Sequence, residues 1–292
     1  MKTATITLAH GRHRHLLEQR RGLLRQSVPA DDAIVVAMGD LQIAELISDG
    51  LLPGTTVEMP ADASGLPLAA ARNEGARIAL KRGAELLVFL DVDCIPGRGL
   101  VEAYQDAAQD PRWASSLLSG PVTYLEPPGP NGYDAERVEL KDAPHPARPA
   151  PAAGEVQLGD DRNLFWSLSF AVTADNWRRI GGFHEGYRGY GAEDTDFARV
   201  AGNLGVGLAW VGGARAYHQW HPTSNPPVQH LHDIARNANL FRERWRVWPM
   251  VGWLQAFREL GLLEGGLGDE PCVVVQEPGQ PRSAELEHSD NS

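Results

Sequence analysis

The sequence predicts an α/β fold with a mainly parallel, mixed sheet flanked by helices. Short β-rich runs alternate with amphipathic stretches through the first half of the chain, which is typical of βαβ units. One run, Leu86–Leu90, is apolar without alternation, as expected of a strand covered on both faces. The 292 residues, 42% of them hydrophobic and 22% charged, suffice to bury a sizeable core. We therefore expect a single domain over residues 1–262, closed by C-terminal helices.

Hydrophobic periodicity assigns the individual elements. Leu16 and Leu23 share one face of a first helix, and the Ala-rich residues 67–81 predict a second. A later helix shows Phe197, Val200 and Leu204 at helical spacing. The predicted strands are residues 3–9, 33–38, 55–59, 85–90, 163–173, 208–211 and 214–218. The predicted later helices are residues 175–180, 193–204, 228–245 and 250–260.

Two segments have no clear period. Residues 126–155 contain seven of the 21 prolines and predict a flexible surface loop. Long loops of this kind are usually functional or disordered, so a lid beside a site and a tolerated insertion both remain open. Residues 263–292 are acidic and predict a disordered tail.

Composition excludes several classes of protein. The 27 Lys and Arg against 38 Asp and Glu give a formal charge of −11, which argues against nucleic-acid binding. Cys94 and Cys272 alone cannot form a disulfide framework or a zinc cluster. No run approaches the roughly 18 apolar residues of a membrane span, and no signal peptide precedes the first strand. We expect a cytoplasmic protein, and Trp248 and Trp253 leave a peripheral contact with the inner face of the membrane open.

The sharpest motif is Asp91-Val92-Asp93, which directly follows the buried strand. Ligands of open α/β sheets bind at the carboxyl ends of the strands, so both carboxylates would face a crevice. Mg²⁺ or Mn²⁺ uses one or two such carboxylates together with phosphate oxygens. Acidic residues also end strands simply as turn formers, and the motif alone does not decide between these interpretations.

A second motif, Gly189-Tyr190-Gly191-Ala192-Glu193-Asp194-Thr195-Asp196, enters a helix with three carboxylates in its first turn. The helix dipole favours acidic residues there whether or not they have a function. The dipole does not explain the two glycines beside Tyr190, which suit a backbone that approaches a ligand closely. This motif is the second candidate site.

Histidines and arginines supply further candidates. His218 and His221 follow a short strand, and a neutral imidazole is a common ligand of Mn²⁺ and similar ions. Trp220 between them offers an aromatic face for a sugar ring. Basic and amide groups suited to a diphosphate occur after the first strand and in the Ala-rich helix, and either group could equally belong to a solvated surface. They are His10, Arg12, Arg72 and Asn73.

In combination and in this order, the motifs resemble the GT-A glycosyltransferases that use nucleotide sugars, bacterial family 2 enzymes and the galactosyltransferase C-terminal domain above all. The resemblance covers about residues 3 to 260. It implies a Rossmann-like GT-A sheet and a transferase that needs Mn²⁺ or Mg²⁺. The substrates would be a nucleotide-diphosphate sugar, with UDP-hexose as the default, and a glycan, lipid-linked or small-molecule acceptor.

The resemblance also implies roles for single residues. Asp93 would ligate the metal, Asp91 would contact the ribose or the metal shell, and His218 would complete the shell. Asp194 would be the general base. Arg215 stands where the family usually has a metal-ligating methionine, so the metal shell must differ. The donor would be bound by His10, Arg12, Arg72, Asn73, Asp91, Val92, Asp93, Tyr190 and Gly191. The acceptor would be bound by Tyr190, Glu193, Asp196 and Trp220, with Glu193 also close to the chemistry.

Proton abstraction by Asp194 opposite a metal-bound leaving group predicts a single displacement with inversion, although the fold is known for retaining enzymes as well. Two other functions remain open. A nucleotidyltransferase acting on sugar phosphates also uses acidic pairs and a metal, but usually has a Gly-rich phosphate loop, whereas His10-Gly11-Arg12-His13 has one glycine. A non-catalytic carbohydrate-binding module would not need three carboxylates at a helix start. The sequence does not identify the donor sugar, the acceptor, the linkage or the oligomeric state.

Overall fold

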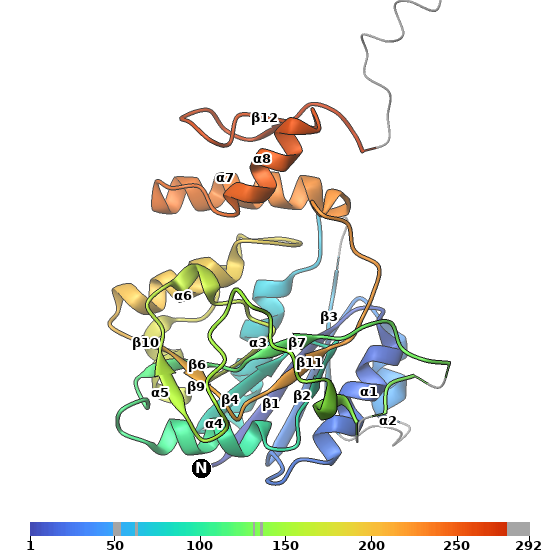
Figure 1. Ribbon diagram of the computed structural model, residues 1–292, viewed down its shortest axis with the longest axis vertical. Helices are drawn as coiled ribbons and strands as arrows, with labels where there is room; N and C mark the ends of the chain where they lie inside the picture. Colours follow the sequence, from blue (N-terminus) through green and yellow to red (C-terminus); the bar gives the residue numbers. More distant parts are fainter. Residues whose placement is uncertain (49–53, 62–63, 131, 135–136, 279–292) are drawn as a thin grey trace, which may run out of the picture.

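A computed structural model describes residues 1–278, apart from 49–53, 62–63, 131 and 135–136. Its centre is an eight-stranded mixed sheet in the order β3-β2-β1-β4-β9-β6-β10-β8 (Figure 1). The first four strands in this order are parallel, β9 is antiparallel to both β4 and β6, and β8 is antiparallel to β10. The strands are β1 (Thr3–Ala9), β2 (Asp32–Met38), β3 (Thr55–Met59), β4 (Leu86–Leu90), β6 (Ser116–Ser119), β8 (Val156–Leu158), β9 (Ser169–Thr173) and β10 (Gly207–Val211).

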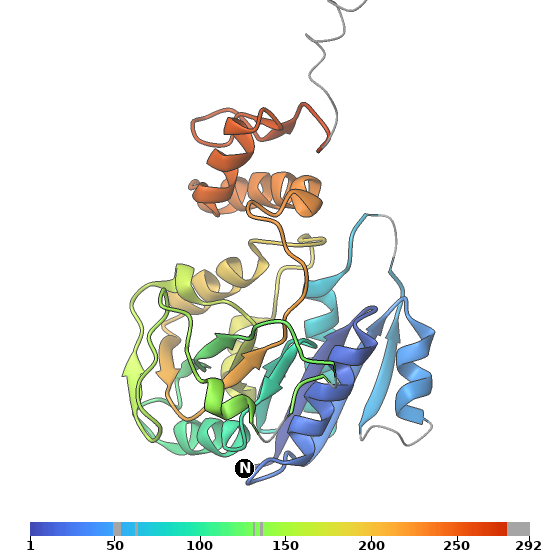
Figure 2. The same cartoon turned by 45° about the vertical axis from the view of Figure 1, so that its right-hand side comes forward.

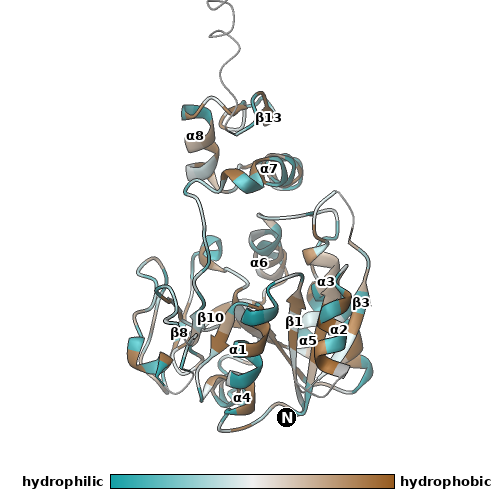
Figure 3. Cartoon of the chain, turned by 90° about the vertical axis from the view of Figure 1, so that its right-hand side faces the viewer, coloured by the Kyte–Doolittle hydropathy of each residue, from teal (hydrophilic) through white to brown (hydrophobic). Residues whose placement is uncertain are grey.

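Helices cover both faces of this sheet. Leu87 and Phe89 of β4 pack on the side of α3, α5 and α6, whereas Leu86, Val88 and Leu90 pack on the side of α4. Strand β4 is therefore apolar at every position because each face meets its own core, and the strands stand out as hydrophobic in Figure 3. The helices are α1 (His13–Leu24), α2 (Leu41–Ser48), α3 (Leu68–Lys81), α4 (Leu100–Gln109), α5 (Ala174–Ile180) and α6 (Glu193–Asn203).

A small sheet in the order β5-β11-β7 lies at the carboxyl edge of the main sheet. Its strands are β5 (Cys94–Pro96), β7 (Val122–Tyr124) and β11 (Ala216–His218). Cys94 pairs with His218, and His218 pairs with Tyr124 on its other side. This sheet joins segments that are far apart in the sequence just beyond the end of β4.

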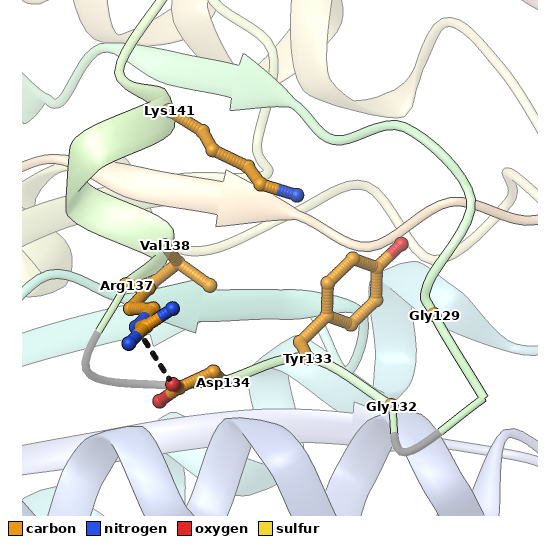
Figure 4. A pocket seen from close by; sticks show the side chains of 7 residues that line it. All are labelled: Gly129, Gly132, Tyr133, Asp134, Arg137, Val138 and Lys141. Atoms are coloured by element: carbon orange, nitrogen blue, oxygen red, sulfur yellow. Dashed lines mark ion pairs between the residues drawn. The ribbon is translucent and has the colours of Figure 1, made fainter.

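The described residues of the Pro-rich segment 126–155 are mostly exposed, but they include ordered structure. It contains the short helix η1 (Val138–Lys141), and both Val138 and Arg148 are buried. Glycines, Tyr133 and η1 enclose a small cavity whose lining includes the ion pair between Arg137 and Asp134 (Figure 4). This packing could not be predicted from hydrophobic periodicity, because single side chains such as Val138 and Arg148 hold the segment and no regularly spaced apolar face does.

The C-terminal part forms a separate layer beside the main α/β body (Figures 1 and 2). Its helices α7 (Leu231–Trp245) and α8 (Val251–Glu259) follow the short helix η3 (Val228–His230) and share a small core. The prediction of a disordered tail from residue 263 is wrong for residues 263–278. There β12 (Leu263–Glu264) and β13 (Val273–Val274) form a hairpin that buries Leu263 and Cys272. The remainder of the predicted tail, 279–292, lies outside the described residues.

The predicted fold class is confirmed, with differences in detail. The predicted strand 163–173 is divided into η2 (Arg162–Leu164) and β9, because Asp161 caps η2 through the backbone N–H of Asn163. Helices α2 and α4 and the strands β5 to β8 were not predicted, because most of these elements are too short to show a period. Within the described part of the chain, every helix is too short or too polar to cross a membrane.

Candidate active site

Asp93, His218 and His221 form a compact group whose ligand atoms all lie within 4.8 Å of one another. Nε2 of His218 and Nε2 of His221 are each 3.5 Å from the Asp93 carboxylate. The small sheet creates this group: the pairing of β5 with β11 aligns residue 94 with residue 218, and the backbone N–H of Gln219 donates to the carbonyl of Asp93 at 2.7 Å. The group joins Asp93 of the Asp91-Val92-Asp93 motif to the histidine pair, which lies more than a hundred residues later in the sequence.

The electrostatics of this group suit a divalent cation. Burial alone would raise the pKa of Asp93, but the hydrogen bond from His221 and the charges of His218, His221 and Arg12 lower it overall. Burial lowers the pKa of His218, which keeps its imidazole neutral at neutral pH. One carboxylate and two imidazoles are a donor set that Mn²⁺ accepts, with positions left for other ligands.

Asp91 lies outside that group of three, and its contact with the ribose or the metal shell stays a prediction. Its carboxylate is 3.5 Å from Arg72, which also donates to Glu193 at 3.2 Å. Arg72 is 4% exposed and therefore links two carboxylates from within the protein, with its guanidinium over the ring of Phe183. It does not lie as an open cation for a diphosphate. The second oxygen of Glu193 is buried and has no partner among the described residues.

Asp91, Glu193 and Asp194 thus form a second acidic group around a single arginine. Burial, reinforced by the charge of Glu193, raises the pKa of Asp194 to about 7. Burial also raises the pKa of Asp91 to about 7, against the attraction of Arg72. A carboxyl group with a pKa near neutrality is suited to accept a proton from a substrate.

The turn before α6 needs both of its glycines. Gly189 has φ of +65°, and a Cβ there would lie 1.9 Å from a carboxylate oxygen of Asp233; a Cβ on Gly191, with φ of +102°, would lie 2.8 Å from the sulfur of Met250. Tyr190, between them, is 42% exposed and stacks on His230 at 4.7 Å between ring centroids. The turn therefore brings the α7–α8 layer against the acidic group.

Three predicted site residues make contacts within the protein. The burial of Asp196 contradicts its predicted contact with an acceptor, whereas the donor contacts of Asn73 and His10 stay predictions. Asp196 is 1% exposed and accepts hydrogen bonds from Tyr187, Arg244 and Trp245, so it joins α6 to α7 and does not face an acceptor. Asn73 accepts from the backbone N–H of Phe183 and donates to Phe183 and Glu185, which fixes the loop before the Gly-Tyr-Gly turn. His10 contacts the carbonyl of Met38 through Nδ1 at 2.6 Å.

The other predicted residues lie around the two groups. Arg12 is exposed at the start of α1 in a left-handed conformation, and its charge reaches Asp93. Trp220 is 44% exposed, and its backbone N–H donates to the hydroxyl of Tyr133 at 2.9 Å. Val92 packs beside the buried Leu16 of α1. Arg215, in the place of the expected methionine, pairs with Asp142 at 3.0 Å instead of facing the histidines.

Sequence reasoning missed part of the site. His221, which the sequence leaves open as a ligand, lies with Asp93 and His218 in one group, the metal-ligand group. Tyr124, whose ring centroid is 4.7 Å from that of His218, was not considered. No local signal identifies Tyr124, because its position depends on the pairing of β7 with β11, which a strand of three residues does not reveal.

Comparisons with known proteins relate part of the sequence, and the fold, to glycosyltransferases. Residues 157–221 match a family model described as the N-terminal domain of galactosyltransferase. A validoxylamine A glucosyltransferase of Streptomyces hygroscopicus subsp. jinggangensis (strain 5008) is 30% identical over 148 residues, which cover 45% of this chain and 34% of the relative. The chain thus spans about a third of the length of the curated relatives that it matches.

Two solved structures share the fold. S. aureus TarS 1-349 in complex with UDP-GlcNAc matches with a TM-score of 0.56 and 13% identity, over 87% of this chain and 76% of TarS 1-349. GalNAc-T7 with UDP, GalNAc and Mn²⁺ matches with a TM-score of 0.55 and 13% identity, over 89% of this chain and 54% of GalNAc-T7. These likenesses establish the GT-A fold.

Proposed function

With the resemblance to GT-A glycosyltransferases confirmed in fold and in sequence, we propose that this chain transfers a hexose from a nucleoside-diphosphate sugar to an acceptor hydroxyl. The observation that carries the proposal is the pair of groups beyond the end of β4: an Asp93-His218-His221 group that fits a divalent cation, beside the half-buried carboxyl group of Asp194, whose pKa is raised to about 7. One group suits the departure of a diphosphate, and the other suits the activation of a hydroxyl.

UDP-hexose is the donor that the comparisons favour. UDP or a UDP-sugar is present in the similar structures of TarS and GalNAc-T7, and Mn²⁺ is present in the latter. The validoxylamine glucosyltransferases suggest a small polyhydroxylated acceptor, and a glycan or a lipid-linked sugar fits the same chemistry. We infer the cytoplasm, or the inner face of the membrane, as the place of action.

On the leaving side, Asp93, His218 and His221 would hold a divalent cation, and Arg12 at the start of α1 adds positive charge near them. When bound, the cation would neutralise charge that develops on the nucleoside diphosphate. The neutral state of His218 and the charged state of Asp93 are both set by the protein, so this group is ready to bind metal near pH 7.

On the attacking side, Asp194 accepts the proton of the acceptor hydroxyl. As this oxygen bonds to the anomeric carbon, the bond from that carbon to the diphosphate oxygen breaks, and its electron pair leaves with the nucleoside diphosphate. A base opposite the leaving group gives inversion at the anomeric carbon. The exposed Tyr190 binds the acceptor beside Asp194, and the buried Glu193 shapes that site through its bond to Arg72.

The test is a set of melting temperatures with Mn²⁺ and each of UDP, GDP, CDP and dTDP, for the wild type and for Asp93→Ala. A ligand at about 100 times its dissociation constant adds roughly 2.7 kcal/mol of stability. We expect a metal-dependent rise with UDP that the variant lacks. Product analysis then separates the alternatives: a nucleoside diphosphate indicates glycosyl transfer, pyrophosphate indicates nucleotidyl transfer, and a wild type without either product contradicts both.

A further inference from the structure

Tyr124, His145 and Trp166 form a row of aromatic rings that begins at the metal-ligand group. The proposed chemistry does not use these side chains. Tyr124 stands 4.7 Å from His218 between ring centroids, at 31°. His145 stands 5.6 Å from Tyr124, and Trp166 stands 5.1 Å from His145, both edge to face. The three rings come from β7, from the Pro-rich segment and from the residues before β9. We call them the aromatic row.

The aromatic row is held rigidly. The backbone N–H of His145 donates to the carbonyl of Val122, and Thr123 Oγ1 accepts from the N–H of Ala143, which ties the Pro-rich segment to β7. Arg148 secures the other end. It is 5% exposed, its guanidinium lies 5.1 Å from the ring of Trp166 and 4.8 Å from that of Trp210, and it donates to Ser119 at 2.8 Å. Two cation–π contacts offset the cost of burying this charge.

The polar tips of the row are available to a ligand. Nδ1 of His145 accepts the backbone N–H of Ala147, so the proton of the neutral ring lies on Nε2. Among the described residues, Nε2 of His145, the hydroxyl of Tyr124 and Nε1 of Trp166 have no hydrogen-bond partner. Tyr124 is 47% exposed, and His145 and Trp166 are half-buried. The row therefore combines aromatic surface with three polar groups that can bind hydroxyls.

That combination fits a sugar ring, which has apolar C–H faces and a rim of hydroxyl groups. We propose that Tyr124, His145 and Trp166 form a sugar-binding subsite beside the metal-ligand group. The proposal rests on the proposed function for the identity of the site, and it names a part of that site which neither motif contains. The ring bound there belongs either to the donor hexose or to the acceptor, since both are sugars or similar polyols near the metal.

The test uses Tyr124→Ala and His145→Ala in the full chain. Tyr124→Phe keeps the ring and removes only the hydroxyl, so it separates the contribution of the aromatic face from that of the polar group. Leu140→Ala is the control, because it removes a side chain that is 83% exposed on the same Pro-rich segment. Two measurements are made: the dissociation constants of UDP and UDP-glucose with Mn²⁺, and saturation-transfer NMR of methyl β-D-glucopyranoside with and without UDP and Mg²⁺.

If the donor hexose occupies the subsite, the alanine variants weaken UDP-glucose about tenfold and leave UDP unchanged, as expected for the loss of about 1.4 kcal/mol of ring contacts. If the acceptor occupies it, both dissociation constants stay the same and the glucoside signal is lost. The subsite is refuted if the wild type binds neither UDP-glucose nor the glucoside. It is also refuted if the alanine variants bind UDP-glucose and the glucoside as the wild type does. A wild type that binds no nucleotide but still binds the glucoside through the row contradicts the proposed function alone.

Discussion

Asp91 and Asp93 are two residues apart in the chain but belong to opposite electrostatic environments. Asp93 faces two imidazoles and the charge of Arg12, and its pKa is lowered. The side chain of Asp91 is more exposed, 29% against 14% for Asp93, and it shares Arg72 with Glu193; its pKa rises to about 7. The side chains are chemically identical, so their different behaviour comes entirely from their neighbours.

The same contrast recurs in the second motif. Asp194 is surrounded by other acids and has a raised pKa, whereas Asp196, two residues on, is enclosed by donors from Tyr187, Arg244 and Trp245. In each motif, one aspartate has its charge stabilised by neighbouring donors or cations, as Asp93 and Asp196 do. The other, Asp91 or Asp194, has its pKa raised to about 7. An acidic motif therefore contains residues with different functions, and the surrounding donors decide between them.

The largest expected effect is that of Asp93→Asn. The loss of the only carboxylate in the metal-ligand group should reduce transfer by more than about 10³-fold, since metal assistance is worth several kcal/mol. It should also abolish the Mn²⁺-dependent rise in melting temperature with UDP. The control is Asp160→Asn, an exposed aspartate elsewhere. Retained metal-dependent binding would remove Asp93 from the proposed metal shell.

Asp194→Asn should lower kcat by about 10² to 10³-fold, because a positioned general base typically contributes 10² to 10⁴. Its nucleotide affinity should stay within about twofold of the wild type. Steady-state kinetics together with the dissociation constant of UDP separate the two effects. Full activity in this variant would exclude Asp194 as the base and break the contrast with Asp93.

The pH profile of kcat/KM should show the raised pKa of Asp194 directly. The base must be ionised to work, so activity should fall about tenfold per pH unit below about 7 and level off above it. The measurement is the rate at limiting substrate concentration between pH 5 and 9. A flat profile down to pH 5 would mean that the base has an ordinary aspartate pKa.

The smallest effect is on stability, and its sign differs between the aspartates of the second motif. The carboxyl group of Asp194 has a higher pKa in the folded than in the unfolded chain. It therefore stabilises the fold most at pH values below its unfolded pKa near 3.8, and this contribution is lost as the pH rises through about 7. At pH 8 without ligands, Asp194→Asn should therefore be more stable by about 1 to 2 kcal/mol. Asp196→Asn should be less stable by about 2 kcal/mol, because it removes the buried carboxylate that accepts hydrogen bonds from Arg244 and Trp245. Thermal melts of both variants should shift in opposite directions.

Much of the fold was predictable because it depends on regular patterns. The strands 3–9 and 55–59 and the helix 67–81 were predicted within one residue of β1, β3 and α3, where apolar spacing extends over several residues. The short elements around the site were not predictable in this way. Strands β5 and β7 contain three residues each, and their pairing with β11 depends on contacts between distant parts of the chain.

The candidate site divides along the same line. Asp93, His218 and Asp194 were found because their residue types and motifs carry chemical information by themselves. Asn73 and Asp196 occur in the same motifs and could not be distinguished from them, since only their hydrogen-bond partners show that they hold the structure together. Tyr124, His145 and Trp166 lie outside every motif and were not found at all.

The sequence alone determined the α/β class, the central apolar strand and the acidic motif at its end, because hydrophobic periodicity and residue chemistry are local properties. Only the tertiary structure decided which aspartate joins the histidines and which has its pKa raised to about 7. It also brought His145 of the Pro-rich segment between Tyr124 and Trp166, and Arg148 against Trp166. These outcomes depend on the distance and burial of groups far apart in the chain, and electrostatic and packing energies depend on those quantities instead of on sequence separation.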